Sequence, residues 1–488
     1  MARRAGRDDR GLADRAADVL LRRLATVVGG RARAQVIVIL ACVLALDSAD
    51  KGMVGALAPA LRQDLGINET EVGALVAVSS GAGALAALPV GLLTDRVNRV
   101  RLLLVSIALW AAAMAAGGLS GSFEMLLCSR VALGAVSATS GPTISSLVGD
   151  YFPVAERGRI YGFILAGEMV GAGFGLMVIG DLGYLLTWRL SFCFLALIGL
   201  ALFWTVKCGL AEPARGGQSR MEPEGWRHRS RRRKGARRDD LAREVVKRRA
   251  IAPDPALVLH RDPARMPLWH AVVYTLLIPT NRLLIVASAL GYFFFAGLRT
   301  FTVEFVSGHY GLGKVEVSLL IPIVGLGALA GVLCGGRLAD RLMRRRRTDA
   351  RVVVPGWACV VAVAVFLPAI ITTSLAAAIP LYTAGAFALA AANPPLDAAR
   401  LDVMHFRLWG RAESTRTFLR MGAEAGSPLV FGFAVDMLSD PASPASGLEY
   451  AFLIMLAPLA ANGVILWRAR HTYARDVATA AASEESTR

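Results

Sequence analysis

Ionisable residues inside long apolar stretches are the features of this sequence that could do chemistry. Asp47, Asp50 and Lys51 lie in one such stretch, and Arg130 lies in another. Ionised side chains are costly in hydrocarbon, so where they occur they usually face a partner or a water-filled space. Three further residues of this kind are Glu168, Arg299 and Glu424. Together these residues predict a polar path through an apolar protein.

The depths of Asp50 and Arg130 in their stretches predict that the two side chains meet. At about 1.5 Å per helical residue, Asp50 lies roughly 22 Å from the inner end of the first stretch. Arg130 lies roughly 10 Å below the outer end of the fourth stretch. In a hydrocarbon core of about 30 Å these depths coincide. We therefore expect one charged cluster of Asp47, Asp50, Lys51 and Arg130.

The residue types in this cluster could carry a proton and bind an anion. Asp50 is a carboxylate that could take up and release a proton. Lys51 and Arg130 are cations that could contact an anion or a lipid headgroup. The alternative is a static network of ion pairs that only ties helices together.

Glu168 and Glu424 fall near the middle of corresponding stretches in the two halves of the chain. Arg420 precedes Glu424 by one helical turn, so this pair could be internally compensated. Arg299 lies in the outer part of its stretch, five residues before Glu304. For Glu168 and Arg299 two roles are equally compatible with the sequence: lining the polar path, or forming an ion pair that is purely structural.

The stretches that carry these charges are long enough to be membrane spans. The chain has 488 residues, is 55% hydrophobic and has a mean hydropathy of +0.51. A helix that crosses a bilayer needs about 20 apolar residues. On this basis we predict an all-α integral membrane protein with twelve transmembrane helices, at about 35–59, 71–93, 102–119, 123–148, 159–181, 190–208, 283–306, 316–338, 352–371, 374–397, 414–436 and 449–467.

A repeated phrase indicates that the chain is a duplication. Residues 91–96 read Gly-Leu-Leu-Thr-Asp-Arg, and residues 336–341 read Gly-Arg-Leu-Ala-Asp-Arg. A shift of 252 residues also places Asp150 on Asp402. Two pseudo-symmetric bundles of six helices are therefore expected.

The repeated phrase also suggests a gate. In each copy a carboxylate at a helix end could bind the N-terminus of a neighbouring helix and an arginine, and this contact would hold the gate shut in one state. The gating candidates are Asp95, Arg96, Arg157, Asp340 and Arg341.

The distribution of arginine predicts the orientation. With both termini placed in the cytoplasm, the inner connections collect most arginines, and the outer ones hold few. We expect a cytoplasmic basic or amphipathic N-terminus at 1–34 and a cytoplasmic tail at 468–488. Between them we expect one bundle at 35–208, a basic cytoplasmic linker at 209–282 and a second bundle at 283–467. The N-terminal stretch Gly11–Val28 is either an amphipathic segment on the membrane surface or a frayed basic tail. The short apolar segment Pro267–Thr280 is expected to be an interfacial helix.

The formal net charge of +17 does not indicate nucleic-acid binding. The densest basic run, residues 227–234, lacks a folded module and interleaved aromatic residues, and a basic run beside a membrane contacts anionic lipid. Residues 308–315 nearly match the sequence pattern of a phosphate-binding loop, but Val315 stands where that pattern has the hydroxyl residue that would hold magnesium. The histidines and cysteines show no metal spacing. We expect no enzyme activity, no cofactor and no metal.

The repeated phrase resembles the loop signature of the major facilitator superfamily of transporters, Gly-x-Leu-Ala-Asp-Arg-x-Gly-Arg. Arg130 with Gly134 resembles the superfamily's fourth helix, and residues 156–159 resemble the loop that follows it. A narrower resemblance is to the Spinster-type lysolipid and sphingolipid transporters, whose first helix carries an Asp-Arg pair where Asp50 and Lys51 stand here. The fifth helix is glycine-rich but lacks the Gly-Pro pair of drug:proton antiporters.

This resemblance implies a secondary active transporter that works by alternating access. The expected partners are an amphipathic small molecule, either a lysolipid or an organic anion, together with protons and membrane lipids. The expected protein is a monomer in the inner membrane of a bacterium. Multidrug efflux is one alternative, and a non-transporting receptor or scaffold with the same fold is another.

Overall fold

The computed structural model describes residues 24–67, 69–216, 221, 250–345, 347–438 and 444–487. All the regular secondary structure of these residues is helical. The helices before the linker are α2 (Arg31–Leu65), α3 (Glu69–Arg96), α4 (Arg99–Gly118), α5 (Phe123–Ser137), α6 (Ser140–Tyr151), α7 (Arg157–Phe174), α8 (Gly180–Leu185) and α9 (Trp188–Gly209). The later helices are α12 (Leu268–Leu277), α13 (Pro279–Tyr310), α14 (Lys314–Arg344), α15 (Ala350–Ile371), α16 (Leu375–Ala391), α17 (Asn393–Asp402), α18 (Trp409–Leu438) and α19 (Pro444–Ser486).

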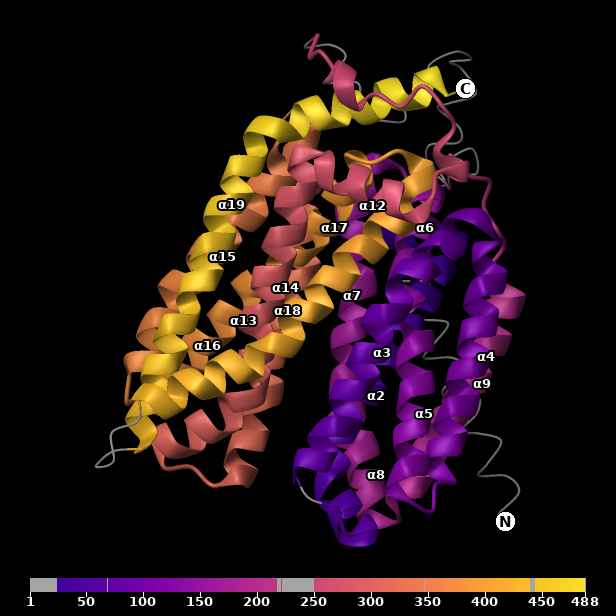
Figure 1. Ribbon diagram of the computed structural model, residues 1–488. Coiled ribbons are helices and arrows are strands. Elements are labelled where there is room, and N and C mark those ends of the chain that lie inside the picture. The colour runs from indigo at the N-terminus through magenta and orange to yellow at the C-terminus, as the bar shows by residue number, and fades with distance from the viewer. Residues whose placement is uncertain are drawn as a thin grey trace.

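The helices form two groups that meet at one end and diverge toward the other (Figure 1). One group contains α2 to α9, and the other contains α13 to α19. The main contacts between the groups are α3 against α18 and α7 against α14. We call the end where the groups meet the linker end, because the described linker segments 210–216 and 250–267 lie there; the opposite end is the far end.

Eleven helical segments in the described part of the chain are long and apolar enough to cross a bilayer. This finding confirms an all-α membrane protein, with each segment overlapping one of the predicted spans. The remaining predicted span, 414–436, corresponds to α18, which has 30 residues and therefore the necessary length. Its first half is too polar for the same test, because it carries Arg411, Glu413, Arg416 and Arg420.

Each long helix begins and ends where the local chemistry allows it. Asn98 caps α4 by accepting a hydrogen bond from the N–H of Arg101, and Ser122 caps α5 in the same way. Gly66 ends α2 in the left-handed conformation, which a residue without Cβ adopts most readily. Between α7 and α8, Gly175–Ile179 form a π-helical turn, a local insertion that is frequent at functional sites.

Small residues bring the backbones of α2 and α7 into contact. A Cβ atom on Gly167, Gly171 or Gly175 would overlap the backbone of α2 at residues 41, 45 and 49. Gly173 lies on the opposite face, where a Cβ atom would have no neighbour within 4 Å. Residues at a spacing of four share one helix face, so this stripe makes a close seam of the kind found between membrane helices.

This seam predicts opposite outcomes for two neighbouring glycines. Gly171→Ala is expected to destabilise the protein by about 1–3 kcal/mol, because the added methyl group overpacks the contact with Ala45. Gly173→Ala is the matched control and should leave the apparent Tm of the detergent-solubilised protein equal to or slightly above that of the wild type, because alanine favours a helix over glycine by about 1 kcal/mol where its methyl group meets nothing. Equal Tm values for the two variants would contradict this account of the seam.

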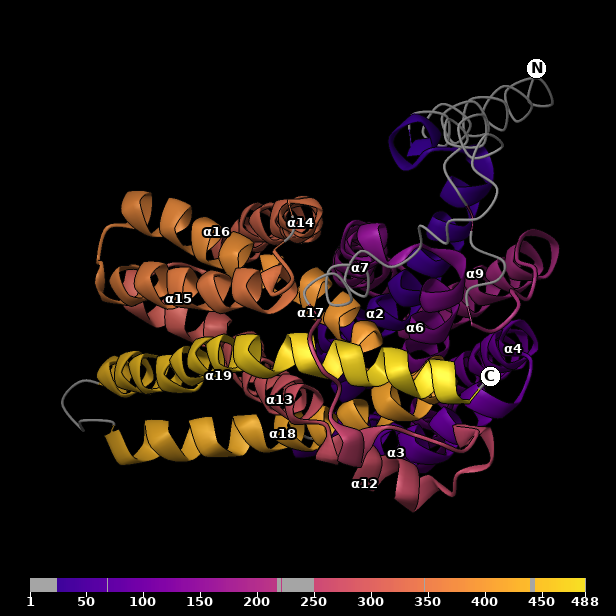
Figure 2. The ribbon, with the colours of Figure 1, turned by 90° about the horizontal axis from the view of Figure 1, so that it is seen from above.

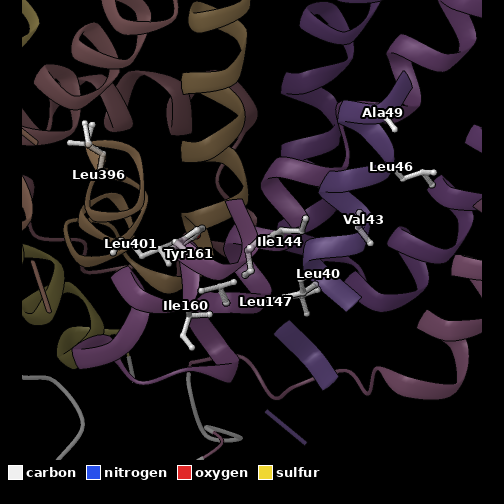
Figure 3. Packing of buried hydrophobic residues seen from close by; sticks show 14 of the residues in the cluster. Leu40, Val43, Leu46, Ala49, Ile144, Leu147, Ile160, Tyr161, Leu396 and Leu401 are labelled. Carbon is white, nitrogen blue, oxygen red and sulfur yellow. The ribbon is translucent and has the colours of Figure 1, made fainter. Parts of the chain in front are cut away.

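Apolar side chains from both groups belong to one buried cluster that runs through the protein, and Figure 3 shows part of it. Leu40 and Val43 come from α2, Ile144 comes from α6, Ile160 comes from α7, and Leu401 comes from α17. Because the cluster contains residues of both groups, hydrophobic burial helps to hold the two groups together.

The C-terminal helix continues well beyond the predicted span. α19 runs to Ser486, and Figures 1 and 2 show it bending over the linker end and extending toward the first group. The expected interfacial helix is present as α12, which leads directly into α13. The expectations for residues 1–23, including most of the amphipathic stretch, and for the basic run 227–234 lie outside the described residues.

Candidate functional site

Asp50 and Arg130 form a buried ion pair between α2 and α5. Both terminal nitrogens of Arg130 donate to the carboxylate of Asp50, at 2.7 and 2.9 Å. The two side chains are only 5% and 4% exposed. A two-pronged contact of this kind is the strongest common ion-pair geometry and fixes both groups in orientation. The structure thus brings together the two residues that the depth argument predicted to meet.

Lys51 and Asp47 form a second pair, one turn apart on α2. The Lys51 Nζ atom lies 2.7 Å from Asp47 Oδ2, and the Lys51 side chain is 45% exposed. Lys51 also interacts electrostatically with Arg420 and Glu424, which belong to the other group of helices. The Lys51 side chain is therefore only partly covered by protein, and charges of both groups of helices lie near it.

Glu168 of α7 and Glu424 of α18 lie near Lys51. Both are partly buried, and Glu168 interacts electrostatically with Lys51, Arg420, Asp47 and Glu424. Arg420 and Glu424, which the sequence suggested could compensate each other, do not form an ion pair. Arg420 instead covers the ring of Tyr292 on α13, with 4.2 Å between its guanidinium carbon and the ring centroid. Arg299 is exposed on α13.

The linker-end half of α18 carries a buried polar network that sequence reasoning missed. Arg416 donates to Glu413 and to Ser288 of α13, the latter at 2.9 Å. Arg400 of α17 lies 3.4 Å from Glu413 and also pairs with Asp397. The spacing of residues 413, 416, 420 and 424 places them on one face of a helix. This periodicity is the feature of the sequence from which the network could have been predicted.

Asp95 joins α3 to the N-terminus of α18. Its carboxylate accepts the backbone N–H groups of Gly410 and Arg411, at 2.8 and 3.1 Å, and the Arg411 Nε atom at 2.7 Å. The guanidinium and the carboxylate are fully buried. A carboxylate at a helix N-terminus compensates both the free N–H groups and the helix dipole. We refer to Asp95, Gly410 and Arg411 as the first gate contact, after the gating role that the sequence predicts for Asp95.

Asp340 makes the corresponding contact between α14 and α7. Its Oδ2 atom accepts the backbone N–H of Arg159 at 2.7 Å, and its Oδ1 atom lies 3.3 Å from Arg351 of α15. A Cβ atom on Gly336 would overlap the backbone of Gly158, so the helices touch there. Asp340, Arg159 and Arg351 form the second gate contact.

The arginines that neutralise the gate region are not those beside the repeated aspartates. Arg96 and Arg341 are exposed, whereas Arg99 and Arg351 are fully buried. Arg99 pairs with Asp150, and Arg351 pairs with Asp402. A shift of 252 residues relates the two pairs, the same shift that relates Asp150 to Asp402 in the sequence.

Arg157 connects the two groups of helices at the linker end. Its guanidinium donates to the carbonyl of Gly149 at 2.7 Å and lies 3.5 Å from Asp402 of the second group. It also covers the ring of Trp409, at 5.1 Å from the centroid. Its counterpart at a shift of 252 residues is Trp409, which donates to the carbonyl of Leu401.

Residues 250–267, the second described segment of the linker, lie over the first gate contact, and we call this segment the strap. The carbonyls of Pro263 and Met266 accept hydrogen bonds from Arg411, at 3.0 and 2.8 Å. Asp262 pairs with Arg407. Burial acts to raise the pKa of Asp262, but the N–H of Ala264 and the charge of Arg407 outweigh it, so its pKa lies below its ordinary value. Asp262 therefore stays ionised at neutral pH and keeps this contact.

The C-terminal helix contacts Asp402, which pairs with Arg351 of the second gate contact. Tyr473, fully buried on α19, donates to Asp402 at 2.6 Å. Thr479 and Ser483 of α19 accept backbone N–H groups of the strap at Asp254 and Leu259. Nothing in the spacing of these residues predicts such long-range contacts, and sequence reasoning did not find them.

Comparison with known proteins identifies the class to which this arrangement belongs. The family model of the Major Facilitator Superfamily matches residues 40–425, well over half of the chain. The chain therefore belongs to the major facilitator superfamily, a family of transporters rather than of enzymes. The resemblance carried by the repeated phrase is thereby confirmed.

Individual relatives and solved structures agree with this family. The chain is 30% identical over 146 residues to the probable L-galactonate transporter of Escherichia coli strain K12, covering 30% of this chain and 32% of that protein. It is 23% identical over 319 residues to a D-galactonate transporter of Escherichia coli O6:H1, covering 65% and 69%. It is 26% identical over 459 residues to an MFS-type efflux pump of Mycolicibacterium smegmatis, covering 90% and 93%.

Two solved structures share the fold at low identity. One is a bacterial homologue of the human lysosomal transporter Spinster in an inward-facing, unoccupied conformation, with a TM-score of 0.57, 18% identity, and 91% and 98% of the two chains covered. The other is the human organic anion transporter MFSD10, with a TM-score of 0.62, 18% identity, and 89% and 99% covered. At this identity the likeness shows the fold alone.

Proposed function

We propose that this protein is a proton-coupled secondary transporter that carries an organic anion by alternating access. The observation that carries the proposal is the buried Asp50–Arg130 pair beside the solvent-exposed Lys51. A buried carboxylate that is tied to a cation can release that cation when it takes up a proton. The gate contacts at Asp95 and Asp340 close the linker end, whereas the Lys51 side chain is only partly covered by protein.

The relatives support an organic anion as the substrate class. Two of them are named for galactonate, a carboxylate, whereas a lysolipid is supported only by a likeness in fold to a Spinster homologue. Cations at the interface between the groups suit a carboxylate. Drug efflux is the second candidate, because the efflux pump of Mycolicibacterium smegmatis aligns over 90% of this chain.

We also propose that the linker end faces the cytoplasm of a bacterial cell. The described residues at this end include Arg33, Arg99, Arg157, Arg351 and Arg411, and the excess of arginine in membrane proteins lies on the cytoplasmic side. Both chain termini would then be cytoplasmic. A closed linker end would make the described conformation one that opens toward the outside.

Asp50→Asn is the variant that tests the coupling. In proteoliposomes with a pH gradient, the wild type is expected to accumulate D-galactonate or benzoate above equilibrium. Asp50→Asn should lose this accumulation, because an amide cannot carry the proton, while exchange of labelled for unlabelled substrate continues. Asp181→Asn, at an exposed position near the far end, is the control and should accumulate substrate like the wild type.

The same assay decides between transport and the other class of function. A receptor or scaffold would give no flux of any organic acid, with or without Asp50. Accumulation that persists in Asp50→Asn with unchanged pH dependence would contradict the coupling role, although transport itself would stand.

A further inference from the structure

Arg420 is a cation at the interface between the two groups of helices, and no carboxylate among the described residues contacts it directly, although Glu424 and Glu168 lie close enough to interact with it electrostatically. Its guanidinium forms no hydrogen bond and no ion pair with any residue that the structure describes, and its Nε atom is buried without a partner. The other cations near it are paired: Lys51 with Asp47, and Arg416 with Glu413.

The position of Arg420 makes this isolation costly. Arg420 lies about 16 Å along α18 from the start of the helix, which is well inside a hydrocarbon core of about 30 Å. A charged residue at such a depth costs a few kcal/mol, and its presence usually marks a pathway for substrates or ions. The ring of Tyr292 offsets part of this cost, because a cation over an aromatic face is attracted to the ring.

Tyr292 supports the guanidinium without using its hydrogen bonds. A ring contact occupies one flat face of the group, whereas the N–H donors lie in its plane. A planar guanidinium held against a ring is therefore ready to bind a carboxylate in the two-pronged manner. The side chain of Lys51, which interacts electrostatically with Arg420, is only partly covered by protein, so a small ligand has room beside it.

We propose that Arg420, supported by Tyr292, is the group of the second half that binds the carboxylate of the transported anion. This assignment rests on the proposed transport of an organic anion and names where its charge is recognised. The substrate would then lie between Lys51 of α2 and Arg420 of α18, and would contact both groups of helices. Glu424, one turn away, is the carboxylate with which the substrate competes for Arg420.

The assignment is tested by binding to the purified, full-length protein in detergent. The probes are D-galactonate, benzoate and galactitol, the last being an uncharged analogue of galactonate. By calorimetric titration, the wild type should prefer galactonate to galactitol. Arg420→Gln should lower the affinity for both carboxylates by at least about 30-fold, a typical effect of removing one member of a buried charge pair, and should leave any binding of galactitol unchanged.

Two further variants separate recognition from folding. Arg420→Lys should recover only part of the affinity, because an ammonium lacks the two-pronged geometry. Lys207→Gln is the matched control: it removes another cation that covers an aromatic ring, 4.6 Å from Trp204 on α9, in a place remote from the interface. Its affinities should equal those of the wild type.

Each outcome has a distinct meaning. Carboxylate binding that survives Arg420→Gln in a protein with a normal Tm would overturn the assignment and leave the proposed function standing. A fall in Tm with unchanged affinity would show that Arg420 only braces α13 against α18, and would also overturn it. A wild type that binds neither carboxylate would overturn the proposed function together with this assignment.

Discussion

Replacing Asp95 with alanine is expected to open the linker end. The change strands the buried guanidinium of Arg411 and two N–H groups at the start of α18. Leaving a buried charge without its partner costs about 3–5 kcal/mol, and here the cost falls on the closed conformation alone. The protein should therefore spend most of its time with α3 and α18 separated.

A cysteine at position 414 reports this change. Ser414 is fully buried in the closed linker end, where a Cβ atom on Gly91 would overlap it. In a background without the six native cysteines, Ser414→Cys should react with a water-soluble maleimide on the order of 100-fold faster when Asp95→Ala is added. Asp181→Ala is the control and should leave the rate unchanged; an equally slow rate in Asp95→Ala would refute the gate.

Removing Arg351 is expected to destabilise the fold as well as the gate. This fully buried side chain pairs with Asp402 and Asp340 and donates to the carbonyl of Val154 in the other group of helices. Arg351→Ala leaves two buried carboxylates without this cation, so we expect a loss of about 3–5 kcal/mol in the free energy of unfolding.

The measurement is the apparent Tm of the purified protein. Arg351→Lys should fall between the wild type and Arg351→Ala, because a single ammonium cannot reach three acceptors in the geometry of a planar fork. Arg345→Ala removes a neighbouring arginine that is exposed, and its Tm should not change measurably. If Arg351→Ala and Arg345→Ala have the same Tm, the buried network does not stabilise the fold.

The sequence was most informative where a single helix determines the outcome. Apolar length predicted the spans because hydrocarbon thickness sets the length of a crossing helix. Rise per residue predicted that Asp50 and Arg130 lie at one depth, and the structure brings them together. The repeated phrase pointed to Asp95 and Asp340, whose carboxylates do bind helix N-termini.

The sequence was less informative where contacts depend on how helices approach one another. Arg96 and Arg341 follow the repeated aspartates directly, yet they point to the surface, and Arg411 and Arg351 neutralise the carboxylates from other helices. Arg420 stands one turn from Glu424 but covers Tyr292 of α13 instead of forming the pair. Spacing along one helix shows which side chains share a face, but not which neighbour that face meets.

The polarity of α18 has a consequence for how the chain enters the membrane. An arginine or aspartate at the centre of a helix opposes release from the translocon by about 2.5–3.5 kcal/mol, and the first half of α18 contains several such charges. Their buried partners, Ser288 and Arg400, belong to α13 and α17, which are synthesised earlier. Insertion of α18 should therefore wait until the preceding helices have assembled, which makes the most polar helix a late step in the biogenesis of the protein.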